Sequence, residues 1–383
     1  MSELHESASS AEDRASALDV GRRFDSQKMT DAEHEAVVAA GEQLAEYAGG
    51  IWILISGEFT SDDHEVGTEG QIREMLYRAF DYPGDRPHPG LRLNVLLDSP
   101  GGSLDSAYTT ALYLSAYSGD VRVFVPGRAK SASTLLAIGA DRLYLSVFGE
   151  LGPLDTQLPD PRNPANHLSA LDCYQSVDYV RDFGIRTMKE MLPTLISKTG
   201  RRISVSDLLQ RSQDFAIGAI GPMLHSVSAL DFGGWGRSLR IGEYYAKRLL
   251  SNRVEGVDSD LVSDIARQLV FNYTHHLFPI DYHEARRINL PVELMDEEVY
   301  DRADEVVRCC RRKNYVNFMS EEQRNKMPAS YQASKSFSRE FLDGGAGMSE
   351  RTQAQAGRAR RARSQPPPPP PPPPPSPRLR KKQ

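Results

Sequence analysis

Short apolar runs of strand length alternate with helix-like segments between residues 50 and 145, and this alternation constrains the fold more than any other feature. Strands are expected over 50–56, 91–97, 121–125 and 142–145, and helices over 30–47, 69–80, 103–117 and 131–140. Strands that alternate with helices at this spacing build βαβ units around a mainly parallel sheet. The run from Gly50 to Ser56 is apolar nearly throughout, which is typical of a strand buried on both faces. We therefore predict an α/β fold for this part of the chain.

The second half of the chain follows a helical pattern instead. Helices are expected over 168–196, 205–220, 241–250 and 258–273, packed on the sheet or on neighbouring subunits. Gly184 and Pro193 are positions where the first of these helices can break. The glycine-rich segment 231–237 follows no expected strand, so we interpret it as a turn rather than a phosphate-binding loop. Near the start of the chain, Thr30 and Glu33 have the spacing of a capping box, which predicts where the first helix begins.

Composition divides the chain into four parts. We predict a disordered N-terminus over 1–26, an α/β core over 27–160, a helical region that completes the fold over 161–333, and a disordered, proline-rich basic tail over 334–383. The tail contains ten consecutive prolines, Pro366 to Pro375, and such a run adopts an extended polyproline II helix. We interpret the run as a stiff, solvated extension, and the alternative is a ligand for a proline-recognition partner.

Charge is distributed unevenly along the chain. Nine of the 46 basic residues and none of the 52 acidic residues lie from Arg351 onward, so the rest of the chain carries a net charge of −15. Contact with an anionic surface is therefore expected of the tail alone, and nucleic acid is not an expected partner.

Several classes of protein are disfavoured by what the sequence lacks. No apolar run of about 18 residues is present, so we expect no membrane span. The polar, acidic N-terminus does not resemble a secretory signal. Three cysteines, an odd number without metal-type spacing, favour a reducing compartment, and we predict a cytoplasmic protein. The histidines at 275, 276 and 283 lack the spacing of a metal site, and we expect neither a metal nor another cofactor.

Two segments that follow expected strands supply the groups that acyl transfer needs. In residues 98–104, Gly101 and Gly102 permit a sharp turn that leaves backbone N–H groups free. In residues 127–141, Ser131 opens a short apolar helix. Each segment also has a plain structural explanation, since Pro-Gly-Gly forms turns and serine caps helices. Together they offer a hydroxyl nucleophile and N–H donors for a tetrahedral oxyanion, at the strand ends where open α/β sheets place their sites.

These two segments carry a resemblance to known peptidases. Ser99-Pro100-Gly101-Gly102 followed by Ala129-Lys130-Ser131-Ala132 resembles the Clp protease proteolytic subunit and the signal-peptide peptidase A group. The wider stretch 129–157, and His276-Leu277-Phe278-Pro279-Ile280 further on, are similar to the serine dehydrogenase proteinase family. Leu154, Thr156 and Asn289 depart from that family's pattern.

The resemblance implies both a fold and a site. The implied fold is ClpP/crotonase-like, with repeated βαβ units and a mainly parallel sheet followed by a helical C-terminal half. The implied nucleophile is Ser131, and the implied oxyanion hole consists of backbone N–H groups of Gly102 and Ala132 beside Gly101.

The general base is left open by the sequence. The Clp-type subunit has a histidine about 25 residues beyond its nucleophile, where this chain has Asp155-Thr156-Gln157. His276 is one candidate, because an imidazole titrates near neutral pH. Lys130 is another, although neighbouring residues on a tight turn normally point apart. Lysines of the helix after the sheet, at 189 and 198, are weaker candidates. Asp155 either orients the base or caps a turn.

The function predicted from these residues is a serine peptidase that hydrolyses polypeptides through an acyl-enzyme on Ser131. The resemblance implies a homo-oligomer, most simply a closed ring with Ser131 facing the interior. One alternative is a non-catalytic scaffold of the same fold that acts through its proline-rich tail. The other is a crotonase-like acyl-CoA enzyme, which shares the fold and the oxyanion hole.

Overall fold

The computed structural model describes residues 29–61, 67–83, 87–160, 163–199, 202, 204–225, 227–253, 259–310 and 313–325. The predictions of disorder for 1–26 and for 334–383, including the run of prolines, lie outside these described residues.

Within the described residues, six strands form the central sheet, in the order β10-β1-β2-β3-β5-β9. They are β1 (Ile51–Ser56), β2 (His88–Asp98), β3 (Ser118–Val125), β5 (Arg142–Leu145), β9 (Glu293–Leu294) and β10 (Tyr315–Phe318). The strands from β1 to β9 in this order run parallel, and β10 pairs antiparallel with β1. The predicted α/β class with a mainly parallel sheet is therefore confirmed, and β10 makes the sheet a mixed one.

Helices cover both faces of the sheet. They are α2 (Asp31–Ala48), α3 (Thr68–Phe80), α4 (Leu104–Tyr117), α5 (Ala132–Ile138) and α11 (Glu297–Cys310). Trp52 and Leu54 of β1 belong to one core cluster with residues of α2 and α11. Because successive side chains of a strand point to opposite faces, Ile53 and Ile55 point to the other face, where α3 and α4 pack. All four side chains are buried, so β1 is covered on both faces, as its apolar sequence predicted.

The first helix begins where its capping box predicted. The Thr30 hydroxyl accepts a hydrogen bond from the Glu33 backbone N–H at 3.3 Å, and the Glu33 carboxylate accepts one from the Thr30 N–H at 2.8 Å. The same carboxylate pairs with the Lys313 ammonium, with Nζ and Oε2 2.7 Å apart. The hydrogen bond from Lys313, followed by that from Thr30, lowers the pKa of Glu33 to about 2. This pair ties α2 to the segment that leads into β10.

The second half contains the predicted helices, of which α7 and α8 are longer and α9 is shorter than the sequence predicted, and it also contributes strands. The helices are α6 (Ala170–Thr199), α7 (Val205–Leu224), α8 (Ala229–Arg253), α9 (Ser259–Phe271) and α10 (Tyr282–Arg287). Two of the sheet strands, β9 and β10, belong to this half. A separate antiparallel hairpin, β7 (Gln157–Asp160) with β8 (Asn163–Ser169), precedes α6.

Three local predictions for this half were wrong. Neither Gly184 nor Pro193 ends α6. A side chain at Gly184 would meet Ile220 at 3.1 Å, so this glycine lets α6 and α7 approach closely rather than breaking the helix. The segment 231–237 is not a turn but the first part of α8, because Ser228 caps the helix start by accepting the Asp231 N–H at 3.0 Å.

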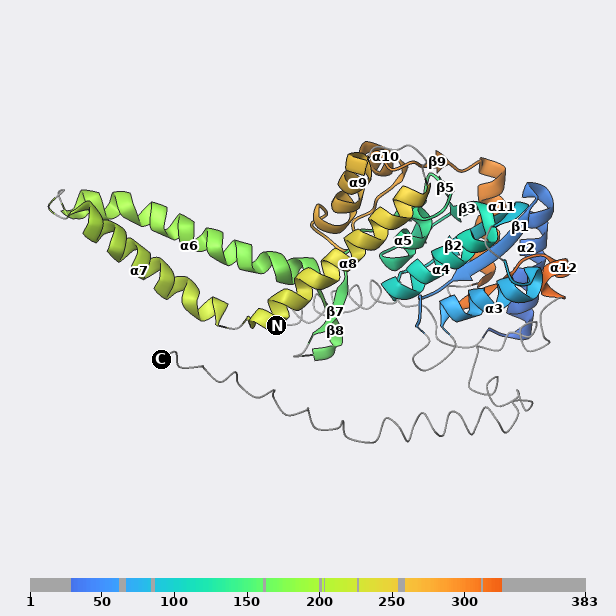
Figure 1. Ribbon diagram of the computed structural model, residues 1–383, viewed down its shortest axis with the longest axis horizontal. Helices are drawn as coiled ribbons and strands as arrows, with labels where there is room; N and C mark the ends of the chain where they lie inside the picture. The colour runs from blue at the N-terminus through green and yellow to red at the C-terminus, as the bar shows by residue number, and fades with distance from the viewer. Residues whose placement is uncertain are drawn as a thin grey trace, which may run out of the picture. The chain divides into compact units, whose positions relative to one another are not determined.

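Helices α6 and α7 form a pair, which we call the helical arm, and Figure 1 shows them side by side, with α8 leading back toward α4 and α5. Several large apolar side chains of the arm and of the start of α8 are exposed: Tyr179, Phe183, Val205, Leu209, Phe215, Ile217 and Leu230. Among the described residues no single helix is both long and apolar enough to cross a membrane. The α7–α8 pair passes that test of length and composition only when taken together across a 72° bend.

Candidate active site

Four segments that are far apart in the sequence lie side by side through backbone pairing. Ser99 pairs with Ala129, Ala129 of β4 (Arg128–Ala129) pairs with Leu151 of β6 (Glu150–Leu151), and Leu151 pairs with Ile280. The Leu151 N–H donates to the Ile280 carbonyl at 2.9 Å, and the Ile280 N–H returns the bond at 3.0 Å. We call this row of pairs the site ladder. It places the turn after β2, the turn before α5, the segment after β6 and the segment after α9 against one another.

Ser131 follows Ala129 of the site ladder by two residues, and its backbone is in a strained conformation. Its φ is 51° and its ψ is −120°, outside the regions that L-residues normally occupy. Such a conformation costs about 1–3 kcal/mol and persists where the surroundings impose it. The surroundings here are tight, because a Cβ on Gly101 would lie 2.8 Å from the Ser131 Cβ and 2.8 Å from the Lys130 carbonyl oxygen. The serine itself is 9% exposed.

The hydroxyl of Ser131 differs from those of its two neighbours. Ser133 donates its hydroxyl to the Lys130 carbonyl at 2.6 Å, and Thr134 donates to the Ala129 carbonyl at 2.7 Å. Thr134 also accepts the Gly152 N–H at 3.0 Å, so both hydroxyls serve the packing of α5. Ser131 occupies the N-cap position of α5, yet its side chain makes no capping hydrogen bond. The capping explanation for this serine is therefore not supported, and its hydroxyl faces a cleft.

The two glycines before α4 have different roles. The Gly101 N–H donates to the Ser99 hydroxyl at 3.1 Å, so it is already used. Phe59 pairs with the backbone on either side of Gly102, with its N–H on the Gly101 carbonyl and its carbonyl on the Ser103 N–H, both at 2.7 Å. No described residue accepts a hydrogen bond from the N–H of Gly102 or of Ala132. These two N–H groups are the ones predicted for the oxyanion hole, and the Gly101 N–H is not available for it.

His276 and Asp155 lie next to each other at the same site. The His276 Nδ1 and the Asp155 Oδ2 are 3.7 Å apart, which is longer than a hydrogen bond, and Nδ1 has no hydrogen-bond partner among the described residues. The Leu171 N–H donates to Asp155 Oδ1 at 3.2 Å and fixes this carboxylate. The Asp155 side chain is 4% exposed and that of His276 is 20% exposed. The pair has the arrangement of an imidazole whose inner nitrogen faces a buried carboxylate.

Lys130 points away from the cleft despite its position beside Ser131. Its ammonium forms an ion pair with Glu150, with Nζ and Oε1 2.9 Å apart, and donates to the Leu151 carbonyl at 3.1 Å. Burial lowers the pKa of Lys130, and the hydrogen bond to Glu150 opposes that shift. This amine therefore links the turn before α5 to β6. The other candidate lysines, at 189 and 198, lie exposed on α6 and do not line the cleft.

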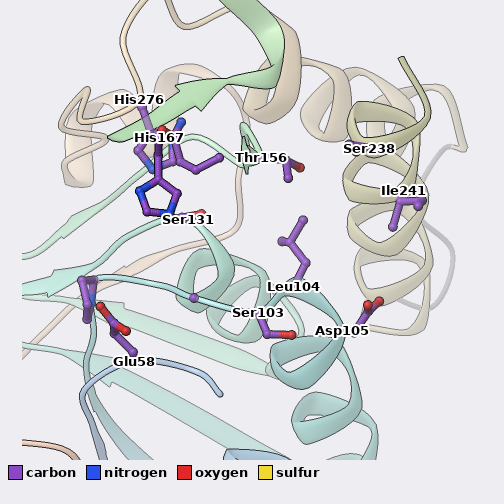
Figure 2. A pocket seen from close by; sticks show the side chains of 13 residues that line it. Glu58, Ser103, Leu104, Asp105, Ser131, Thr156, His167, Ser238, Ile241 and His276 are labelled. Carbon is purple, nitrogen blue, oxygen red and sulfur yellow. The ribbon is translucent and has the colours of Figure 1, made fainter. Parts of the chain in front are cut away.

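The cleft in front of Ser131 has a volume of about 690 Å³. Figure 2 shows Ser131, His276 and His167 toward one end of it, and residues of α4 and α8 toward the other. Its lining consists of Glu58, Pro100, Gly102, Ser103, Leu104, Asp105, Ser131, Thr156, Gln157, His167, Ser238, Ile241 and His276. Sequence reasoning missed Glu58, Asp105 and His167, since they come from the loop after β1, from α4 and from β8, and no short motif joins them.

Within the described ranges, no group of three or more His, Cys, Asp or Glu side chains is placed to hold a metal ion. No protein-family model matches the chain. The chain is 36% identical over 85 residues to an uncharacterized protein of Methanocaldococcus jannaschii, MJ0137. That match covers 22% of this chain and 28% of the archaeal protein, so the similarity is confined to a part of each.

Proposed function

We propose that this chain is a cytoplasmic serine peptidase with a ClpP/crotonase-like fold, related to the serine dehydrogenase proteinases. In this proposal Ser131 is the nucleophile, His276 is the general base and Asp155 orients the imidazole. The backbone N–H groups of Gly102 and Ala132 bind the oxyanion. Polypeptide is the substrate.

The reaction proceeds in two halves. His276 accepts the proton of the Ser131 hydroxyl as the oxygen attacks the carbonyl carbon of a peptide bond, and the resulting oxyanion receives hydrogen bonds from Gly102 and Ala132. The imidazolium then gives the proton to the leaving amine, the C–N bond breaks, and an ester on Ser131 remains. Water, deprotonated by the same imidazole, attacks this ester; the bond between the acyl carbon and the Ser131 oxygen breaks, the imidazolium returns the proton to that oxygen, and the acid product leaves.

The observation that carries the proposal is the site ladder together with the unused hydroxyl of Ser131. Backbone hydrogen bonds hold four segments from distant parts of the chain together, so that Ser131, Gly102 and His276 line one cleft and Asp155 lies beside His276. A purely structural role, as a turn or a helix cap, explains each segment taken alone. It does not explain why Ser131 has a strained backbone while its hydroxyl makes no capping hydrogen bond.

The distance between His276 and Asp155 is relevant to the alternative of a non-catalytic scaffold. At 3.7 Å the pair lacks its hydrogen bond, as a scaffold that has lost catalysis would permit. Catalytic hydrogen bonds are, however, often long without substrate and shorten in the complex. The crotonase-like alternative shares the oxyanion hole but does not require a nucleophilic serine in this strained position.

Assembly is a second part of the proposal. Several large apolar side chains of the helical arm are exposed, and exposed apolar surface often marks a site of protein contact. We propose that this surface contacts other copies of the chain in a homo-oligomer, in its simplest form a closed ring around the clefts. A ring limits access of folded proteins to Ser131.

Hydrolysis of a denatured, fluorescein-labelled protein tests the peptidase proposal. The wild-type chain should release labelled fragments, and Ser131→Ala should release none while unfolding at the same temperature. Hydrolysis that survives in Ser131→Ala would contradict the assignment of the nucleophile. A wild-type protein that is folded and oligomeric but cleaves nothing would favour the scaffold, whereas hydrolysis of acyl-CoA thioesters alone would favour the crotonase-like enzyme.

A further inference from the structure

A carboxylate at the start of α4 lines the same cleft as Ser131, and the proposed reaction does not use it. This carboxylate belongs to Asp105, and Glu58 from the loop after β1 is the other acidic residue of the lining. Among the described residues that line the cleft, no lysine or arginine is present to balance them. Apart from the two histidines, the charge of the cleft is therefore negative.

Asp105 is held in place by aromatic side chains. The Tyr245 hydroxyl of α8 donates to Asp105 Oδ1 at 2.7 Å. The Tyr245 ring stacks on Tyr108, with ring centroids 4.1 Å apart and planes 7° from parallel. The hydrogen bond to Asp105 is the largest cause that raises the pKa of Tyr245 to about 12.

This arrangement fixes a carboxylate without neutralising it. A tyrosine uses one acceptor site and brings no positive charge, so the carboxylate retains acceptor capacity for a ligand. Arg248, also on α8, donates to the Tyr244 hydroxyl at 3.2 Å and does not line the cleft. Because the Asp105 side chain is already ordered by Tyr245, binding of a cation does not have to restrict its rotation, and little side-chain entropy is lost.

We propose that Asp105, with Glu58, selects polypeptide substrates that carry a lysine or arginine side chain within the cleft when a peptide bond is presented to Ser131. A cationic side chain gains a charge-assisted hydrogen bond to a fixed carboxylate, and an acidic side chain is repelled by it. Asp105 and Glu58 are thus specificity residues, and Tyr245 positions Asp105. This inference rests on the proposed function, since it names the substrate class of the same cleft.

Peptide binding to the Ser131→Ala protein tests the inference without any dependence on turnover. Three fluorescein-labelled decapeptides are compared by fluorescence anisotropy, identical except that two central residues are both Lys, both Gln or both Glu. We expect the Lys peptide to bind about tenfold or more tightly than the Gln peptide, since one hydrogen bond to a charged group gives about tenfold to a hundredfold. The Glu peptide should bind most weakly.

Variants in the same Ser131→Ala background identify the residues responsible. Asp105→Asn should reduce the Lys-to-Gln preference to about threefold or less, and Tyr245→Phe, which keeps the stacked ring, should reduce it partly. The matched control is Glu74→Gln on α3, whose carboxylate pairs with Arg78 away from the cleft and whose loss should leave the preference unchanged.

Equal binding of the three peptides, no detectable binding of any, or a preference that survives in both Asp105→Asn and Glu58→Gln would overturn the inference. These outcomes differ from failure of the proposed function, which is the absence of Ser131-dependent hydrolysis in the wild-type chain. A protein that hydrolyses polypeptides without charge preference would therefore refute the specificity and leave the peptidase standing.

Discussion

The turn that leads into α5, residues 129–134, and the helical arm differ in how their side chains are accommodated: those of the turn are buried, and several large apolar ones of the arm are exposed. Around Ser131, the polar groups of Lys130, Ser133 and Thr134 are buried and hydrogen-bonded within the chain. Along α6 and α7, large apolar side chains such as Phe215 remain exposed. The polar groups of the first region find their hydrogen-bond partners within the chain, whereas the second region exposes apolar surface that a partner can cover. Substitutions in the turn should therefore lower stability and activity, and polar substitutions at exposed apolar positions of the arm should weaken assembly.

The largest expected difference comes from the same substitution in the two regions. A Cβ on Gly102, at a φ of +123°, would lie 2.3 Å from the Phe59 carbonyl oxygen, and a Cβ on Gly218 of α7 would meet nothing within 4 Å. Gly102→Ala should lower the free energy of unfolding by about 3 kcal/mol or more. Gly218→Ala should raise it by about 0.5–1 kcal/mol, because alanine favours the helix. Urea denaturation measures both, and similar effects would contradict the comparison.

Substitution of the two histidines of the cleft, His276 and His167, should affect the reactivity of Ser131 to different extents. His276→Ala removes the proposed base, and the rate of reaction of Ser131 with a fluorophosphonate should fall about a thousandfold or more. His167→Ala, a change at an exposed hairpin residue, should alter that rate by less than about tenfold. If instead the His167 variant is the slower one, the base has been assigned to the wrong histidine.

Assembly is expected to depend on the arm. Val205 and Leu209, four residues apart on one face of α7, are both exposed, and so is Val147 near the sheet. The double substitution Val205→Asp with Leu209→Asp should lower the mass measured by light scattering toward 42.6 kDa at micromolar concentration. Val147→Asp should leave it unchanged. A wild-type chain that elutes as a monomer would remove the proposed ring.

The smallest expected effect is a loss of folding stability at acidic pH that arises from Glu33 at the start of α2. Glu33 has a pKa of about 2 in the folded chain, below its ordinary value of 4.5, because it pairs with Lys313 and caps the helix. A carboxylate with a depressed pKa stabilises the fold above pH 4.5, and that contribution is lost as pH falls toward 2. Urea midpoints at pH 6 and pH 3 should therefore differ more in the wild type than in Glu33→Gln. Equal differences would show that the ion pair is not formed.

Local signals predicted the first half of the fold better than the second. Apolar runs located β1, β2, β3 and β5, and the capping box at Thr30 located the start of α2, because each is encoded within a few residues. The two-residue strand β9 and the strand β10 carry too little periodicity to be recognised, and their pairing joins residues far apart in the sequence. The helix over 231–237 was missed because its cap, Ser228, outweighs the glycines that follow.

The candidate site was predicted in its parts but not in its arrangement. The sequence singled out Ser131, His276 and Asp155, and it gave Asp155 as a residue that either orients a base or caps a turn, but it did not establish that Asp155 lies beside His276. Their proximity follows from the pairing of Leu151 with Ile280, and no local pattern signals that pairing. Asp105 was missed for a similar reason, since its partner Tyr245 lies 140 residues away.

The central claim is that Ser131 is an activated nucleophile and its hydroxyl neighbours are structural, and covalent labelling tests it most directly. Wild-type protein, Ser131→Ala and Ser133→Ala are treated with a fluorophosphonate, and adducts are located by mass spectrometry of the digested protein. We predict one adduct per chain on Ser131 in the wild type, none in Ser131→Ala, and an unchanged adduct in Ser133→Ala. An adduct that persists in Ser131→Ala, or a folded wild-type protein that forms none, would contradict the account.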